Sequence, residues 1–449
     1  MDQGLVAKYE LRLPRYTSYP TAPHFSPAVT GGDYGRWLGE LPPDTALSLY
    51  LHIAYCAELC WFCGCHTKIT KRYAPVQDYL EVLLEEVDLV AARLSDRRPV
   101  RHVHFGGGSP TILSPADFSR AIAHLRERFS WTETVEVAVE LDPRTTRQDF
   151  VETMAASGVN RVSLGIQDFD PVVQQAIHRV QPREMSEQVV GWLRQYGIFE
   201  INLDLVYGLP YQTEAGLGST VEQAVSLRPS RVSLFGYAHV PWMKKHQRLI
   251  PEKALPDTET RWRQYEMATA RLQELGYVAI GLDHFALPED GLTVAQRERR
   301  LHRNFQGYTT DAAGVLLGLG ASGIGSLPQG YVANEGDIEA YKRLIRSGQL
   351  AVRRGIAVSD DDRLRRAIIE RLMCDLAVDV AEIAGSHGVS MDSFDTEMNA
   401  MAGLEQDGIL RRDGNRIVVT DEGRPLVRAV CAVFDRYLKR GEARHSQAV

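Results

Sequence analysis

The middle of the chain alternates short β-rich runs with amphipathic helical stretches, and this alternation limits the possible folds more than any other feature. Between the first two runs, Leu80, Leu83 and Val87 recur at helical spacing. Repeated strand, helix and strand predict an α/β fold with a parallel sheet and right-handed crossovers. The predicted strands span residues 47–54, 100–105, 135–141, 161–167, 200–207 and 231–238.

This number of units suits either an open, doubly wound sheet or a partial barrel, and the periodicity does not separate these two closures. Both closures place ligands at the carboxyl ends of the strands. The residues just after the predicted strands are rich in Cys, Gly, Asp, Gln and Glu, so we expect the chemistry at that edge. A later run, residues 277–285, is expected to add a strand or to cap the sheet.

The end of the chain is dominated by helical patterns, of which residues 361–376 are the clearest. Two strand-like runs, 409–412 and 416–420, flank Asp413-Gly414, and an Asp-Gly pair in this position predicts a hairpin. Together with a last helix over 424–438, this pattern predicts a small, mainly helical, winged-helix-like domain.

The composition argues against several classes of protein. The formal net charge of -7 gives no general attraction to nucleic acid or to anionic lipid. The first residues lack the basic stretch and apolar run of an export signal, and no apolar segment approaches the roughly 20 residues of a membrane-spanning helix. We therefore expect a cytoplasmic protein with no nucleic-acid and no membrane partner.

Four cysteines crowd into the loop that follows the first predicted strand. Cys56, Cys60 and Cys63 have a C-x3-C-x2-C spacing, and Cys65 follows them. Thiolates suit iron-sulfur clusters, zinc or copper(I). A structural zinc site with Cys65 or His66 as fourth ligand stays an alternative, although zinc usually takes two ligand pairs from separated segments. In a four-iron cluster, three cysteines would leave one iron open to a cofactor.

This loop resembles that of the radical S-adenosylmethionine superfamily, which has the same cysteine spacing with an aromatic residue, here Phe62, before the last cysteine. Gly106-Gly107-Gly108, after the second predicted strand, is similar to the glycine-rich motif of the superfamily, and glycine lets the backbone approach a cofactor closely. The resemblance implies a partial parallel (β/α)6 barrel. It also implies a [4Fe-4S] cluster on the first three cysteines, with S-adenosylmethionine bound to the open iron.

Further stretches extend the resemblance to the family of oxygen-independent coproporphyrinogen III oxidases. Residues 14–22, 283–286 and 302–309 are similar to stretches of that family. Cys65 also fits its pattern, whereas haem-carrying relatives usually have an aromatic residue there. The sequence departs mildly from the family at Ser109, where threonine is usual, and the serine keeps the hydroxyl group.

The family resemblance implies three parts of the chain. An N-terminal arm covers residues 1–45, the partial barrel with its extension covers 46–345, and the helical C-terminal domain covers 346–449. The resemblance also implies two bound S-adenosylmethionine molecules. The first would contact Tyr50, Gly107, Glu140 and Ile324. The second would contact Phe62, Gly108, Ser109, Gln167, Arg179, Asp204 and Ala238.

The activity implied by the resemblance is oxidative decarboxylation of two propionates of coproporphyrinogen III to vinyl groups, giving protoporphyrinogen IX in haem biosynthesis through a 5'-deoxyadenosyl radical. The substrate carries four carboxylates, and Arg15 and Arg303 are the candidates to bind them. An unidentified electron donor and acceptor are also required, and we expect a monomer. The alternatives are a haem chaperone, another tetrapyrrole-modifying relative, or a zinc-stabilised binding protein.

One further glycine pattern could suggest a nicotinamide cofactor. Gly318, Gly320 and Gly323 satisfy G-x-G-x-x-G, but the motif lies late in the chain. Gly325 and Pro328 follow it, and these residues cannot open a long helix. We therefore expect a close-packed turn that lines the S-adenosylmethionine site.

Overall fold

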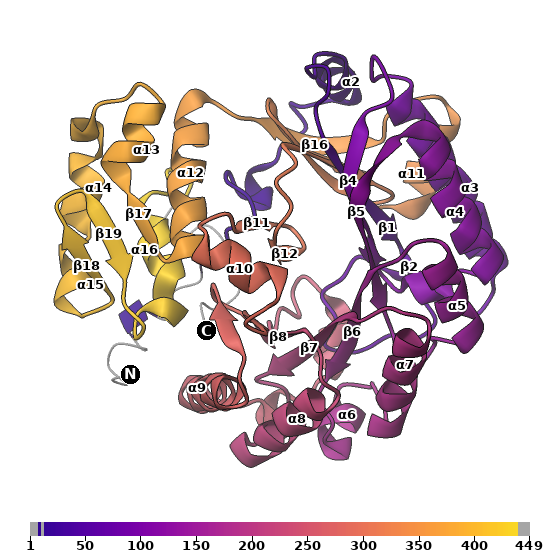
Figure 1. Ribbon diagram of the computed structural model, residues 1–449, viewed down its shortest axis with the longest axis horizontal. Helices are drawn as coiled ribbons and strands as arrows, with labels where there is room; N and C mark the ends of the chain where they lie inside the picture. The colour runs from indigo at the N-terminus through magenta and orange to yellow at the C-terminus, as the bar shows by residue number, and fades with distance from the viewer. Residues whose placement is uncertain (1–7, 10–12, 439–449) are drawn as a thin grey trace.

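The computed structural model describes residues 8–9 and 13–438. The outermost parts of the expected arm (1–7 and 10–12) and of the expected C-terminal domain (439–449) lie outside the described residues. In the described part, a 12-stranded sheet forms the centre of the larger lobe (Figure 1). From one edge to the other its strands are β16 (Val352–Ala357), β15 (Gly330–Asn334), β14 (Ile324–Leu327), β13 (Val315–Leu319), β1 (Leu47–Ile53), β4 (Pro99–Gly107), β5 (Ser130–Leu141), β6 (Arg161–Gln167), β7 (Glu200–Tyr207), β8 (Arg231–Gly236), β10 (His284–Ala286) and β9 (Val278–Ile280).

Strands β1 and β4 to β8 lie side by side in chain order, and every neighbouring pair is parallel. A doubly wound sheet would reverse its order part of the way along the chain, so this arrangement is a partial (β/α)6 barrel, as predicted. The connecting helices lie along the outer side of these strands (Figure 1). They are α3 (Ala74–Ala91), α4 (Pro115–Arg128), α5 (Gln148–Ala156), α6 (Pro171–Ala176), α7 (Arg183–Gln195) and α8 (Glu214–Ser226).

The helical stripe seen in the sequence explains why α3 packs on the sheet. Leu80 and Leu83 are fully buried and belong to the same hydrophobic core as Leu49 and Leu51 of β1. Burial of such side chains stabilises the fold by about 1.5–3 kcal/mol each. This packing holds α3 against β1. The loops at the carboxyl ends of the strands are then available to carry functional residues.

Antiparallel strands extend the sheet at both edges. Strand β13 runs parallel to β1, and β14, β15 and β16 follow it as an antiparallel meander. At the other edge β10 pairs antiparallel with both β8 and β9. The run at 277–285, expected to add a strand or cap the sheet, therefore contributes to two short edge strands.

The late glycine pattern is a close-packed turn, as expected. It leads from β13 directly into strand β14, whereas a dinucleotide site would lead into a helix. A Cβ atom on Gly318 would lie 2.3 Å from the carbonyl carbon of Ile324, and Gly320 has a φ of 94°. Glycine is required at both positions because a side chain would clash in the first and strain the backbone in the second.

The C-terminal region forms a separate, mainly helical unit, shown in orange and yellow in Figure 1. It contains α12 (Asp360–Asp375), α13 (Val380–Ser386), α14 (Asp395–Ala400), α15 (Ala402–Gln406), α16 (Val427–Val433), β17 (Ala377–Asp379), β18 (Leu410–Asp413) and β19 (Arg416–Val419). The predicted hairpin is confirmed, because β18 and β19 pair antiparallel around Asp413-Gly414.

The last helix is shorter than the predicted 424–438. It begins with a 3-10 turn, η6 (Arg424–Leu426), and its α-helical part ends at Val433. The Asp435 carboxylate accepts a hydrogen bond from the backbone N–H of Tyr437, and such local side-chain bonds compete with helix.

The N-terminal arm packs against the C-terminal unit. Tyr16 and Tyr19 belong to the same buried cluster as Ile368 and Leu372 of α12.

No helix in the described part is long and apolar enough to cross a membrane. The boundaries 1–45, 46–345 and 346–449 stay predictions. The remaining elements are η1 (Ala22–His24), α2 (Gly31–Gly39), β2 (Tyr55–Cys56), β3 (Lys68–Ile69), η2 (Pro110–Ile112), η3 (Lys245–Leu249), η4 (Glu252–Ala254), α9 (Thr258–Glu274), α10 (Gly291–Arg297), β11 (His302–Asn304), β12 (Gly307–Thr309), α11 (Ile338–Arg346) and η5 (Met391–Phe394).

Candidate functional site

The cysteine loop lies between β1 and α3 and is held by the glycine motif of β4. The backbone N–H of Gly108 donates to the carbonyl of Ile53 over 2.8 Å, and that of Ser109 donates to the carbonyl of Tyr55 over 2.9 Å. A Cβ atom on Gly108 would lie 2.4 Å from the same Tyr55 oxygen. The motif therefore fixes the start of the loop through backbone contacts that only glycine permits at this position.

Each of the three predicted cluster ligands accepts a hydrogen bond at its sulfur. Cys56 accepts from the Thr67 hydroxyl over 3.3 Å, and Cys63 accepts from the backbone N–H of Cys65 over 3.3 Å. Burial raises the pKa of Cys56 to about 11, whereas a hydrogen bond from Cys65 lowers the pKa of Cys63 to about 6. Cys60 accepts from two arginines described below.

Each of the three sulfurs can bind one iron of a four-iron cluster. Among residues 8–9 and 13–438, no three His, Cys, Asp or Glu side chains gather closely enough to hold one metal ion. Donors at the sulfurs suit thiolates that carry negative charge in a cluster.

Two arginines donate to the sulfur of Cys60, and one carboxylate holds them both. Arg144 reaches the sulfur over 3.2 Å and Arg179 over 3.5 Å. Asp142 pairs with Arg144 at 2.7 Å and with Arg179 at 3.2 Å. The family resemblance implied a role for Arg179, whereas nothing in the sequence analysis singled out Asp142 or Arg144. Their position just after β5 was the available signal, because all the chemistry was expected at that edge.

Two of the predicted carboxylates line a cavity of about 260 Å³ on the inner side of the barrel strands. Glu140 accepts from the His104 ring over 2.9 Å and from the Gly107 N–H over 3.3 Å. Burial opposes ionisation of Glu140, but the hydrogen bond and charge of His104, the Gly107 N–H and the charge of His52 together outweigh it, and the pKa is lowered. Asp204 accepts from the Ser163 hydroxyl over 2.8 Å, and burial raises its pKa. The cavity thus holds two carboxylates with opposite tendencies to ionise.

Several other predicted residues gather around the same edge. The Tyr50 hydroxyl lies 3.1 Å from Nδ1 of His52, and the other ring nitrogen of His52 lies 2.7 Å from the carbonyl of His66 in the cysteine loop. A Cβ atom on Gly107 would lie 2.4 Å from the same His52 ring. Gln167, the last residue of β6, has a backbone φ of 70°, which lies in the left-handed region. His52, which no sequence pattern singled out, therefore joins this edge to the cysteine loop.

A segment after β8 closes over the cysteine loop. The Gln247 side-chain amide donates to the carbonyl of Phe62 over 2.9 Å and to that of Ala238 over 3.2 Å. His246 contacts the carbonyl of Cys63 over 2.8 Å. Gln247, which no sequence pattern singled out, therefore joins two of the predicted cofactor residues. Ile324 enters from β14, on the far side of β13 from β1.

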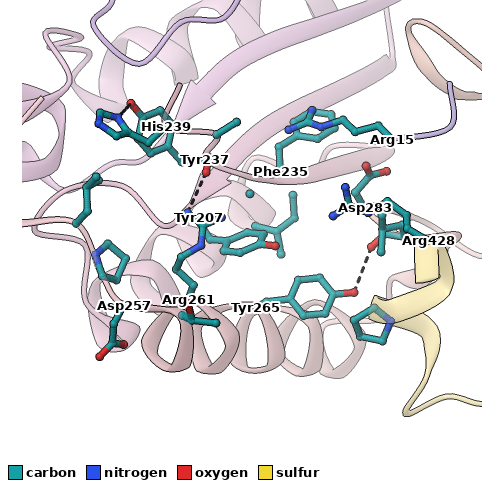
Figure 2. A pocket seen from close by; sticks show the side chains of 18 of the residues that line it. Arg15, Tyr207, Phe235, Tyr237, His239, Asp257, Arg261, Tyr265, Asp283 and Arg428 are labelled. Atoms are coloured by element: carbon teal, nitrogen blue, oxygen red, sulfur yellow. Dashed lines mark hydrogen bonds between the residues drawn. The ribbon is translucent and has the colours of Figure 1, made fainter. Parts of the chain in front are cut away.

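The two arginines predicted to bind substrate are not brought together. Arg303 is buried, pairs with Asp283 at 3.4 Å and lies 4.3 Å from the ring centroid of Tyr308. Arg15 instead lines a second cavity of about 410 Å³, distinct from the one that contains Glu140 and Asp204. Arg261 and Arg428 line the same cavity (Figure 2).

A partial barrel with a three-cysteine loop at the carboxyl ends of its strands defines a radical S-adenosylmethionine enzyme. The family model described as "Radical SAM superfamily" matches residues 50–224, and the one described as "HemN C-terminal domain" matches residues 358–426. The cofactors of this class are a [4Fe-4S] cluster and S-adenosylmethionine.

Proteins similar over their whole length narrow the class to one family. The oxygen-independent coproporphyrinogen III oxidase of Bradyrhizobium diazoefficiens is 51% identical over 100% of both chains. That of Paracoccus denitrificans is 41% identical over 98% of this chain and 97% of its own. The solved coproporphyrinogen III oxidase of Escherichia coli superposes with a TM-score of 0.92 at 37% identity, covering 97% of this chain and 99% of that one. The chain belongs to the family of oxygen-independent coproporphyrinogen III oxidases.

Proposed function

We propose that this enzyme converts coproporphyrinogen III to protoporphyrinogen IX by oxidative decarboxylation of two propionates, a step of haem biosynthesis. The observation that carries the proposal is the meeting of the cysteine loop, the glycine motif and the inner carboxylates at one edge of a partial barrel. The family membership of the whole chain supports the choice of substrate.

We propose Cys56, Cys60 and Cys63 as the cluster ligands. When bound, the cluster and S-adenosylmethionine supply a 5'-deoxyadenosyl radical that removes a hydrogen atom from each propionate, which then loses carbon dioxide and one electron to leave a vinyl group. Arg144 and Arg179 place positive charge at the sulfur of Cys60. With a cluster bound, this charge would favour its reduced form, which carries more negative charge.

The inner carboxylates and the glycine backbone suit the binding of S-adenosylmethionine. Glu140, whose pKa is lowered, can accept hydrogen bonds from ribose hydroxyls or an ammonium group. Arg179 can pair with a carboxylate. We propose Tyr50, Gly107, Glu140 and Ile324 as contacts of the first molecule. We propose Phe62, Gly108, Ser109, Gln167, Arg179, Asp204 and Ala238 as contacts of a second molecule.

The remaining partners are inferred from the chemistry of the reaction. Each decarboxylation needs an electron donor for the cluster and an acceptor for the electron released from the substrate, and neither protein nor compound is identified. A cytoplasmic location, a monomeric state and the lack of nucleic-acid and membrane partners stay predictions.

The test is anaerobic turnover by the reconstituted protein with reductant, S-adenosylmethionine and coproporphyrinogen III, followed by liquid chromatography. We expect stepwise loss of two carbon dioxide units together with formation of 5'-deoxyadenosine. Cofactor cleavage without decarboxylation would contradict the proposed substrate and favour another tetrapyrrole-modifying relative. Tight haem binding in the same protein would favour the haem chaperone.

A further inference from the structure

A cavity lined by three arginines lies where three distant parts of the chain meet, beside the cofactor edge. Its volume is about 410 Å³, within the range of small-molecule sites. Arg15 comes from the N-terminal arm, Arg261 from α9 and Arg428 from α16. Figure 2 shows Arg15 on one side of this cavity, Arg261 and Tyr265 along the opposite side, and Arg428 with Asp283 at one end.

The described residues that line this cavity include three arginines and two aspartates. Arg15, Arg261 and Arg428 all line the cavity together with Tyr207, and Arg261 lies 5.7 Å from the centroid of the Tyr207 ring. Arg428 is only 5% exposed; its burial and the nearby charge of Arg15 lower its pKa to about 10. The buried Arg428 and the exposed Arg15 repel each other, and an anion that joins them relieves this repulsion.

The carboxylates that line the cavity already have other partners. Asp283 pairs with Arg303 at 3.4 Å and accepts from the His284 ring over 2.7 Å. Asp257 caps helix α9 by accepting from the backbone N–H of Thr260 over 2.8 Å.

Arg261 donates to the carbonyl of Tyr237 over 2.9 Å, and Arg428 donates to that of Leu13 over 3.4 Å. Because a guanidinium carries five N–H donors, an arginine that is engaged in the fold can also bind a carboxylate.

The rest of the wall suits flat, apolar rings. Its aromatic lining residues are Tyr207, Phe235, Tyr237, Trp242 and Tyr265. Phe235 also lines the inner cavity that contains Glu140 and Asp204, so the two cavities lie on either side of one ring. Ala238, one of the proposed cofactor contacts, is part of the same wall. A molecule held here would therefore lie beside the cofactor site.

We propose that Arg15, Arg261 and Arg428 bind the propionate carboxylates that the reaction leaves intact, while the aromatic wall holds the adjoining pyrrole rings. This assignment rests on the proposed function. Anchoring the retained carboxylates in the outer cavity directs the reacting half of the tetrapyrrole towards the inner cavity across Phe235. Arginine suits the task, because its planar guanidinium binds a carboxylate through two parallel hydrogen bonds.

The test compares binding of an acid and its ester to the reconstituted holoenzyme. Coproporphyrin III carries the four carboxylates, and its tetramethyl ester has the same ring system without their charge. We expect Arg15→Gln and Arg261→Gln each to weaken binding of the acid by roughly tenfold or more, and to leave binding of the ester unchanged. Arg261→Lys should recover part of the affinity for the acid, since it keeps the charge.

Arg263→Gln is the matched control, because Arg263 lies on the same helix and pairs at the surface with Glu214 and Glu259. This variant should bind both probes as the unaltered enzyme does. In turnover, the two cavity variants should raise KM for coproporphyrinogen III by a similar factor. Iron content and 5'-deoxyadenosine formation without tetrapyrrole should stay the same, which a general loss of structure would not allow.

The possible failures are distinguishable. If the unaltered enzyme decarboxylates coproporphyrinogen III while the arginine variants keep its KM, the cavity assignment is overturned and the proposed function stands. Equal weakening of acid and ester would also overturn the assignment, because it would indicate a structural role for the arginines. If the unaltered enzyme neither binds nor decarboxylates the tetrapyrrole, both proposals fail.

Discussion

The Arg144 guanidinium donates a hydrogen bond to the sulfur of Cys60 over 3.2 Å while Asp142 holds the same guanidinium at 2.7 Å. Donors at a ligand sulfur favour the reduced, more negative cluster. We expect Arg144→Gln to lower the cluster's reduction potential by about 59 mV, which equals about 1.4 kcal/mol for one electron. A redox titration followed by electron paramagnetic resonance measures this shift.

Arg147→Gln serves as its control, because Arg147 forms only a surface pair with Asp149. Its potential should match that of the unaltered enzyme. An unchanged potential in Arg144→Gln would mean that the Arg144 hydrogen bond has no electronic effect on the cluster.

The cysteine loop offers a direct test of which thiols hold iron. Cys56→Ser, Cys60→Ser or Cys63→Ser should each lose most of the iron and acid-labile sulfide after anaerobic reconstitution, because each of these thiolates is proposed to bind a different iron. Cys65→Ser is the matched control and should keep both, since Cys65 is expected to be a non-ligand. Loss of the cluster in Cys65→Ser, with retention in any of the other three, would contradict the assignment.

The glycine motif should not tolerate a side chain at Gly107. Its φ of 103° is unfavourable for other residues, and a Cβ atom would lie 2.4 Å from the His52 ring. We expect Gly107→Ala to destabilise the local backbone by about 1–3 kcal/mol and to weaken S-adenosylmethionine binding, measured by calorimetry on the reconstituted protein. Gly191→Ala, in α7 with open space around it, should leave binding intact. Normal affinity in Gly107→Ala would exclude the motif from the cofactor site.

Glu86 should make stability depend on pH. It is 1% exposed and accepts hydrogen bonds from Gly320, Asn334 and Tyr341, and burial raises its pKa to about 7. The folded state therefore binds a proton more tightly than the unfolded chain does, and the free energy of unfolding falls as pH rises from about 4.5 to about 7. The loss should reach up to about 3 kcal/mol.

Urea denaturation at pH 5 and pH 8 measures this difference. Glu86→Gln should show a smaller difference between the two pH values, since glutamine does not ionise. Glu85→Gln, on the exposed side of the same helix, should keep the full difference. An equal pH dependence in the Glu86 variant and the unaltered protein would assign the effect to other groups.

The predicted elements of the barrel agree closely with the structure because their signals are local. The run at 161–167 and the observed β6 have the same bounds, as do 200–207 and β7. By contrast, the last predicted helix, 424–438, is interrupted, because the Asp435 side chain bonds to the backbone of Tyr437. Periodicity reports which residues are apolar, and it does not report such competing side-chain bonds.

By itself, the sequence determined the parallel α/β core and the cysteine loop at its carboxyl edge, because periodicity and ligand spacing are properties of neighbouring residues. The tertiary structure decided between the two sheet closures, since strand order depends on which distant segments pair. It also decided that Arg303 is buried against Asp283, while Arg15 meets Arg261 and Arg428 in one cavity. The arm, the barrel and the C-terminal unit contribute one arginine each to that cavity, and only long-range packing brings such residues together.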